Sequence, residues 1–149
     1  MQAAAVRVYI PVSAAELLLL SQQGHLPIES GWSATAALMQ VYGLEEDDFD
    51  MGEAVAMALA AGASRNSDAE SAPSVRRVVA ADVEGGCPEA PEEPGRVLVS
   101  GLLALSQVVS IHVDSTATRP PRSDELEDVA QLQWFDVAEV ADAAQAPQA

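Results

Sequence analysis

The sequence contains no lysine, and its seven basic residues are all arginines. Such a chain cannot provide the lysine of a phosphate-binding P-loop, of a Schiff base or of a pyridoxal-phosphate enzyme. A single cysteine, Cys87, cannot form an internal disulfide and is typical of a reducing compartment. One cysteine and two histidines are also too few for a zinc finger or a three-histidine zinc site. We therefore expect no metal and no cofactor.

Several common signatures are missing as well. The chain has no G-x-G-x-x-G after a strand, no G-x-S-x-G turn and no H-E-x-x-H pair. No uninterrupted apolar stretch reaches the roughly 18 residues that a membrane-spanning helix needs. The first residues lack the charged and apolar regions of a signal peptide. These absences lead us to expect a soluble, cytoplasmic protein.

Acidic residues outnumber basic ones by 23 to 7, and the formal net charge is −16. A surface of this charge repels nucleic acid and anionic membranes, so neither is an expected partner. The charge favours solubility, and it would also suit a docking surface for a basic protein partner. Aromatic residues make up only 4% of the chain, which predicts a core of small and aliphatic side chains.

A strand and a helix are predicted at the start of the chain. Residues 7–12 alternate apolar and polar side chains and predict a strand that ends near its proline. Ser13 and Glu16 have the spacing of a capping box, so a helix should follow. Gly24 suits the left-handed cap at the end of that helix.

The next segment is expected to be mainly helical. Residues 25–27 should lead away from the first helix, residues 31–35 should form a short strand, and residues 36–42 a short helix. The acidic run at 45–50 should open a long helix that reaches about residue 63. We interpret these acids as partners of the helix dipole, since the run lacks the order of a calcium loop. The expected core face of the helix is Met51, Val55, Ala58 and Leu59.

The second half of the chain is richer in predicted strands. Residues 77–83 form an apolar run that predicts a central strand buried on both faces. The longest apolar run, 96–114, should contain two strands joined by a short link near Leu105. The remaining predictions are a loop at 84–95 and another at 118–123, a helix that starts at Ser123, and a last strand at 133–137.

These elements run in the order β-α-(β)-α-α-β-β-β-α-β. They indicate an α+β fold with a single mixed or antiparallel sheet of about five strands, packed against helices. A chain of 149 residues has the length of one domain. We place this domain at 1–140, with an acidic Pro/Glu loop at 84–95 and a flexible tail at 141–149.

Ser110, His112 and Asp114 are the residue types of a catalytic triad, at alternate positions of one predicted strand. Such positions lie about 6.5–7 Å apart, whereas a triad needs hydrogen bonds of about 2.6–3.2 Å. We therefore reject the triad and interpret His112 as a structural, hydrogen-bonded histidine. If this strand end is functional, His112 would transfer a proton and Asp114 would orient it or anchor a ligand.

Tyr9, Trp134 and Asp136 are the candidate binding residues, because they fall near predicted strand ends. On the last strand, alternation should bury Phe135 and leave Trp134 either partly buried or at the surface. Since aromatic rings are scarce, we interpret Trp32 and Trp134 as core fillers rather than as contact anchors.

A group of segments resembles a known family. The segments are R-V-Y-I-P (7–11), R-V-V-A-A-D-V (77–83) and V-V-S-I-H-V-D (108–114), with W-F-D-V near the end. Together they resemble an uncharacterised family of conserved hypothetical proteins from high-GC actinobacteria, classed as a domain of unknown function. That resemblance implies no activity, cofactor or catalytic residue. W-F-D-V-A-E-V (134–140) is similar to a late segment of Nudix hydrolases, but the glutamate-rich Nudix box is missing.

Two functions remain open on the sequence alone. The first is a non-catalytic binding or protein-interaction module that acts on a protein partner or on a second copy of itself. The second is a small-ligand binder or an enzyme with a site at the strand ends around His112 and Asp114. We favour the first, since no catalytic constellation is present.

Overall fold

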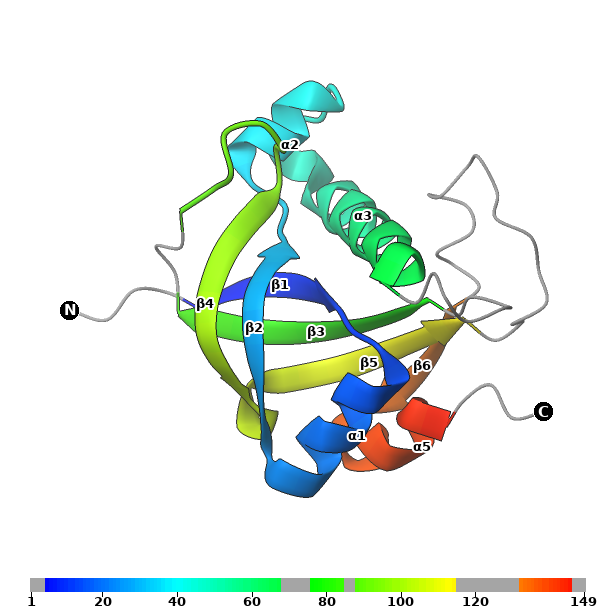
Figure 1. Cartoon of the computed structure of the whole chain (residues 1–149). Helices are drawn as coiled ribbons and strands as arrows, with labels where there is room; N and C mark the ends of the chain where they lie inside the picture. Colours follow the sequence, from blue (N-terminus) through cyan, green and yellow to red (C-terminus); the bar gives the residue numbers. More distant parts are fainter. Residues whose placement is uncertain (1–4, 68–75, 85–87, 115–131, 146–149) are drawn as a thin grey trace.

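The structure, a computed structural model, describes residues 5–67, 76–84, 88–114 and 132–145, and within these ranges six strands form one sheet (Figure 1). The strand order is β4-β2-β1-β3-β5-β6, and each neighbouring pair is antiparallel. This confirms the α+β prediction in its antiparallel form, with one strand more than expected.

The strands are β1 (Ala5–Pro11), β2 (His25–Trp32), β3 (Arg77–Glu84), β4 (Arg96–Ala104), β5 (Val108–Asp114) and β6 (Leu132–Asp136). The α-helices are α1 (Ala14–Gln23), α2 (Ala36–Val41), α3 (Phe49–Ser67) and α5 (Val140–Gln145). Short 3-10 helices precede or link them: η1 (Glu46–Asp48), η2 (Leu105–Gln107) and η3 (Val137–Glu139).

The start of the chain folds as its local signals predict. Ser13 Oγ accepts a hydrogen bond from the amide of Glu16 at 3.1 Å, and the Glu16 carboxylate accepts one from the amide of Ser13 at 2.9 Å. Gly24 ends α1 with a φ of +79°. The capping box and the left-handed cap are therefore confirmed.

Strand β2 corrects two predictions. Residues 25–27 begin the strand instead of leading up to it, and residues 33–35 lie after it. Pro27 is tolerated because β2 pairs with β1 only at Trp32 opposite Tyr9, and is otherwise paired with β4 alone. The predicted strand at 31–35 therefore overlaps β2 only at its last two residues, Gly31 and Trp32.

Helix α3 begins within the acidic run as expected, at Phe49 and not at residue 45, and runs four residues further than predicted, to Ser67. Val55 and Ala58 are buried as predicted, whereas Met51 is half exposed, so its assignment to the core was wrong. Alanines fill much of the buried face, and this allows the helix to approach the sheet closely. The four that pack there are Ala56, Ala58, Ala60 and Ala61.

Strand β3 is a central strand buried on both faces, as predicted. On one side of the sheet, Val79 joins Val8 and Ile10 in a core with α1 and α5. On the opposite side, Ala80 lies with Tyr9 under α3. Figure 1 shows the sheet between these two layers, with α3 on one side and α1 and α5 on the other.

The long apolar run folds as predicted into two strands and a short link, β4, η2 and β5. The two strands are not neighbours, however: β4 is an edge of the sheet, and three strands separate it from β5. Because η2 has only three residues, the sheet must curl so that the end of β4 approaches the start of β5 (Figure 1). The pairing of β2 with β4 is interrupted once, by a register shift between Ile28 and Ser30, which pair with Gly101 and Leu98.

The C-terminal part is built from β6, η3 and α5. Ala143 and Ala144 of α5 are buried in the core against α1, so residues 141–145, which we assigned to the tail, are helical. The helix predicted from Ser123 and the loop at 118–123 lie outside the described residues. Of the predicted 84–95 loop, residues 85–87 also lie outside them.

Candidate functional site

The predicted site residues share one face of the sheet. Tyr9 and Ser110 lie on either side of Ala80, and Asp136 lies opposite Ser110. His112 lies opposite Trp134 on the neighbouring strand. All of these are on the side that α3 covers in part. Tyr9 is two strands from Ser110, roughly 10 Å.

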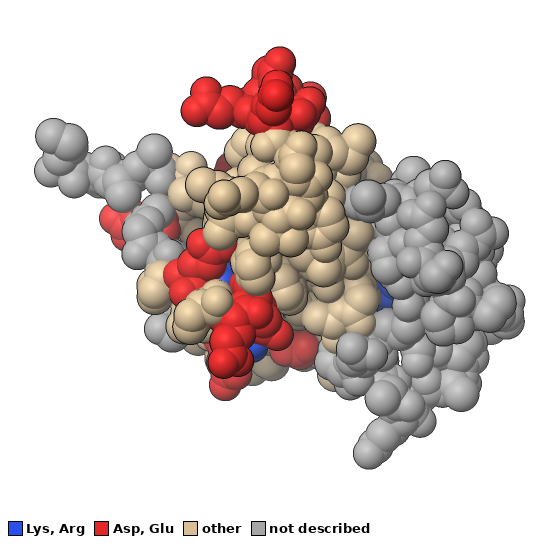
Figure 2. Space-filling view, turned by 90° about the horizontal axis from the view of Figure 1, so that it is seen from above, with Lys and Arg blue, Asp and Glu red and all other residues tan. Residues whose placement is uncertain are grey.

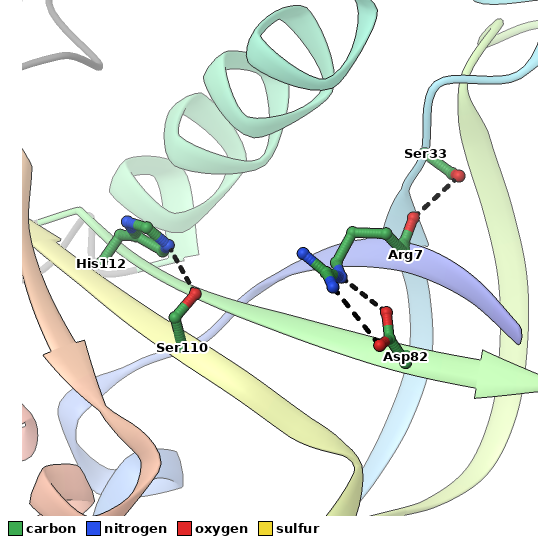
Figure 3. Close-up of polar contacts among 5 residues, drawn as sticks. All are labelled: Arg7, Ser33, Asp82, Ser110 and His112. Atoms are coloured by element: carbon green, nitrogen blue, oxygen red, sulfur yellow. Dashed lines mark hydrogen bonds and ion pairs between the residues drawn. The ribbon is translucent and has the colours of Figure 1, made fainter. Parts of the chain in front are cut away.

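Ser110 and His112 are in direct contact (Figure 3). Ser110 Oγ and His112 Nε2 are 2.9 Å apart, within hydrogen-bond distance. The prediction that alternate residues of a strand cannot make such a contact was wrong. That prediction used the distance between backbone positions, whereas the two side chains lean toward each other along the strand. The side chain of Asp114 lies outside the described structure, so its role stays a prediction.

Burial sets the chemistry of this pair. Burial of the ring lowers the pKa of His112 to about 4, because desolvation disfavours the charged imidazolium. The imidazole is therefore neutral at pH 7 and can exchange a hydrogen bond with a hydroxyl. Ser110 is only 7% exposed, so a substrate has little access to its oxygen. This geometry suits a structural contact better than a nucleophile.

The last strand shows the predicted alternation. Phe135 is buried, and Trp134 is 58% exposed. Trp134 is therefore not the core filler that we expected, and Trp32 is only partly buried against the cluster under α3. The backbone amide of Asp136 donates to Glu139 at 3.0 Å, which closes the turn into η3.

A second polar cluster, which the sequence analysis missed, lies where β1 meets β3 (Figure 3). Arg7 lies opposite Asp82, and its Nε donates to the Asp82 carboxylate at 2.6 Å while Nη2 donates to the other oxygen at 3.3 Å. Ser33 Oγ donates to the carbonyl of Arg7 at 2.9 Å. The sequence did contain a signal for this pair. Arg7 in β1 and Asp82 in β3 each interrupt an apolar run, and a partly buried charge needs a partner.

The carboxylate of Glu53, on α3, acts on this cluster. Burial, followed by the negative charge of Glu53, raises the pKa of Tyr9 to about 12. The pKa of Arg7 is also raised, first by its hydrogen bond to Asp82 and to a smaller extent by Glu53. An open pocket lies beside these groups, and it is lined by Ala5, Val6, Arg7, Ser33, Ala34, Phe49, Glu53 and Asp82. We call it the Glu53 pocket.

A largely apolar groove lies next to this pocket, where α2 meets the start of α3. Its lining residues are Ala34, Ala36, Met39, Gln40, Leu44, Glu45, Glu46 and Phe49. We call it the α2–α3 groove. Phe49 at its edge is 50% exposed, and Tyr42 and Met51 nearby in the chain are also exposed. No pattern in the sequence indicated this groove, because its lining residues come together only when α2 packs beside the start of α3.

A third pocket lies beside β2 and includes Arg96. The Arg96 guanidinium donates from Nε to Ser30 Oγ at 3.2 Å and from Nη1 to the Glu93 carboxylate at 2.5 Å. None of these three pockets is lined by Tyr9, His112, Trp134 or Asp136. The α2–α3 groove and the Glu53 pocket, which meet at Phe49, are therefore better candidates for a binding site than the predicted residues.

The described ranges contain no cluster of three or more His, Cys, Asp or Glu side chains that could hold a metal ion. In the same ranges, no helix combines the length and apolar character needed to cross a membrane. Among curated proteins and solved structures, no match to the chain was found. A family of unknown function (DUF6912) matches residues 6–143, from β1 through most of α5. The chain therefore belongs to the DUF6912 family.

Proposed function

We propose that this protein is a non-catalytic interaction module, and that its α2–α3 groove binds a basic amphipathic helix of another protein. The observation that carries the proposal is the exposed ring of Phe49 at the edge of an apolar groove. Large apolar side chains beside a groove are typical of contact surfaces, because burying them makes the free energy of binding more favourable.

Charge around the groove favours a basic partner. Five of the six residues at 45–50 are acidic, and all six are exposed. Figure 2, which looks down on the molecule from the side of α2, shows acidic side chains at the edge of a largely uncharged surface. An acidic rim attracts a basic segment and repels acidic ones, while the apolar floor supplies affinity.

The shape of the groove favours a helix over an extended peptide. Its walls come from two helices and the segments that flank them, not from an open strand edge. Amphipathic helices bind such grooves with apolar anchors one turn apart, whereas extended peptides add to the edge of a sheet.

The test is a binding titration with a synthetic amphipathic helix of about 18 residues, with leucines along one face and arginines at the remaining positions, including those that flank the leucines. Fluorescence anisotropy of the labelled peptide with the full chain should give saturable binding. Phe49→Ala should weaken it by about thirtyfold, since loss of an aromatic anchor costs about 2 kcal/mol.

The matched control is Leu102→Ala, which truncates another large exposed apolar side chain, on β4 and outside the groove. This variant should bind the peptide as the native chain does. A second peptide with the same leucines and glutamates in place of arginines should bind much more weakly. Absence of saturable binding, or equal losses in the two variants, would refute the proposal.

A small-ligand binder or enzyme around His112 and Asp114 remains the second candidate. It is favoured by the 2.9 Å contact between Ser110 and His112. It ranks second because Ser110 is buried and none of the three pockets includes His112. If His112 is functional, the His112→Gln variant should keep the thermal stability of the native chain. If His112 is structural, the thermal stability of the variant should fall.

We also propose a cytoplasmic location and a source among high-GC actinobacteria. The single cysteine supports the first, and the alanine-rich composition with arginine as the sole basic residue type supports the second.

A further inference from the structure

We infer that the Glu53 pocket receives one basic side chain of the partner helix, and so selects which helices the α2–α3 groove accepts. This inference rests on the proposed function and adds a specificity site to it. It follows from the continuity of the α2–α3 groove with the Glu53 pocket and from the charges within the Glu53 pocket.

The two depressions share part of their lining. Both Ala34 and Phe49 line the α2–α3 groove on one side and the Glu53 pocket on the other. Phe49 and Glu53 are four residues apart on α3, so they lie on the same helical face, one turn apart. A helix with an apolar residue against Phe49 would therefore place a neighbouring side chain over the pocket.

The pocket has an unbalanced negative charge. Two donor nitrogens of Arg7 are directed at Asp82, and these two charges offset each other. Ser33 is also engaged, with its hydroxyl donating to the carbonyl of Arg7. Within the described structure, no hydrogen bond or ion pair reaches the Glu53 carboxylate. One acceptor with a full negative charge thus remains for a ligand.

Electrostatic effects on the neighbours agree with this assignment. Glu53 raises the pKa values of both Arg7, which lines the pocket, and Tyr9, which is buried under α3. A carboxylate in that position stabilises positive charge beside it.

The chemistry of the pocket selects a cationic side chain over other ligands. An anion would need the guanidinium of Arg7, which Asp82 already occupies. An arginine side chain could pair with Glu53 and also stack on the half-exposed ring of Phe49.

The experiment is a double-mutant cycle between the protein and the arginine-containing peptide. Each arginine of the peptide is replaced in turn by citrulline, which keeps the shape of the side chain and removes its charge. Each peptide is titrated against the native chain and against Glu53→Gln. One citrulline position should weaken binding to the native chain by about threefold to tenfold and have no effect on Glu53→Gln.

Glu29→Gln is the matched control, because it removes one negative charge from an exposed glutamate on β2 outside both depressions. It should leave the effect of every citrulline unchanged. If the peptide binds and Phe49→Ala weakens it, but no citrulline couples to Glu53, the specificity site is refuted and the groove stands. If Phe49→Ala has no effect on binding, the groove itself is refuted.

Discussion

His112 shows at the scale of one residue how burial decides what a side chain can do. The folded protein holds this imidazole neutral, whereas the unfolded chain protonates it near pH 6.5. As the pH falls below 6.5, the unfolded state therefore binds a proton that the folded state does not. Stability contributed by the neutral ring is complete above pH 6.5 and is lost as the pH falls toward 4.

The pH dependence of stability tests this role. Between pH 7.5 and pH 5, His112 should account for a loss of about 2 kcal/mol in the free energy of unfolding. His112→Gln should remove that part of the pH dependence. The measurement is urea denaturation at a series of pH values, with the difference between the native chain and the variant plotted against pH.

His25→Gln, at the exposed histidine of β2, is the control and should follow the native curve. If the free energy of unfolding of His112→Gln changes with pH in parallel with that of the native chain, the ring titrates alike in the folded and unfolded states.

Single-residue contacts were the hardest features to predict from sequence. The contact between Ser110 and His112 depends on how two side chains lean, which the spacing of backbone positions does not contain. The pairing of Arg7 with Asp82 needs the register of β1 against β3, which joins residues far apart in the chain. Alternation, by contrast, correctly predicted that Phe135 is buried, although Trp134, which we interpreted as a core filler, is exposed.

At the scale of elements, the segment at 88–95 is more tightly held than its composition suggests. One oxygen of Glu89 accepts from the hydroxyl of Thr35 at 2.5 Å and from the amide of Gly95 at 2.6 Å. The carbonyl of Gly95 accepts from the amide of Ser33 at 2.8 Å. This acidic loop therefore fixes the start of α2, which forms one wall of the α2–α3 groove.

Gly95 packs closely against Leu38 of α2. Its φ of +93° is unfavourable for other residues, and an added Cβ would collide with the buried side chain of Leu38. Gly95→Ala should therefore lower the free energy of unfolding by about 3 kcal/mol, from backbone strain and overpacking together. Chemical denaturation measures this loss.

Gly43→Ala separates the two causes, because Gly43 also has a positive φ, of +67°, but its Cβ would enter open space. That variant should lose only about 1 kcal/mol, from backbone strain alone. Losses of equal size in the two variants would show that the contact with Leu38 contributes nothing.

Local signals predicted most elements, and the exceptions have physical causes. The capping box at Ser13, the helix after the acidic run and the two strands of 96–114 were predicted because each depends on neighbours in sequence. Most of strand β2 was missed because it is held by pairing with distant β4, which no local pattern contains. The groove and the Glu53 pocket could not be predicted, since both need the packing of α2 and α3 against the sheet.

At the scale of the whole molecule, the net charge of −16 is the dominant electrostatic feature. The acids at 45–50 are exposed and close together, so they repel one another in the folded state more than in an extended chain. Screening of this repulsion should outweigh the weakening of partly exposed pairs such as that of Arg7 with Asp82.

Raising the salt concentration should therefore stabilise the protein. From about 0.02 M to about 0.3 M NaCl, the screening length falls from roughly 20 Å to roughly 6 Å, and Tm should rise by several degrees. Differential scanning calorimetry gives the measurement. A variant with Glu46→Gln and Asp47→Asn should show a smaller rise of Tm with salt than the native chain. A Tm that falls with salt would mean that attractive ion pairs dominate.

The order of strands in the sheet has a consequence for how the chain is made. While the first 76 residues leave the ribosome, β1 and β2 can pair only at Tyr9 opposite Trp32, because their main partners, β3 and β4, have not yet been synthesised. Helices α1 and α3 then have no sheet to cover, and their apolar faces are open to water. The growing chain is thus most vulnerable to aggregation before β3 emerges, and the acidic segment at 45–50 is already present to keep it in solution.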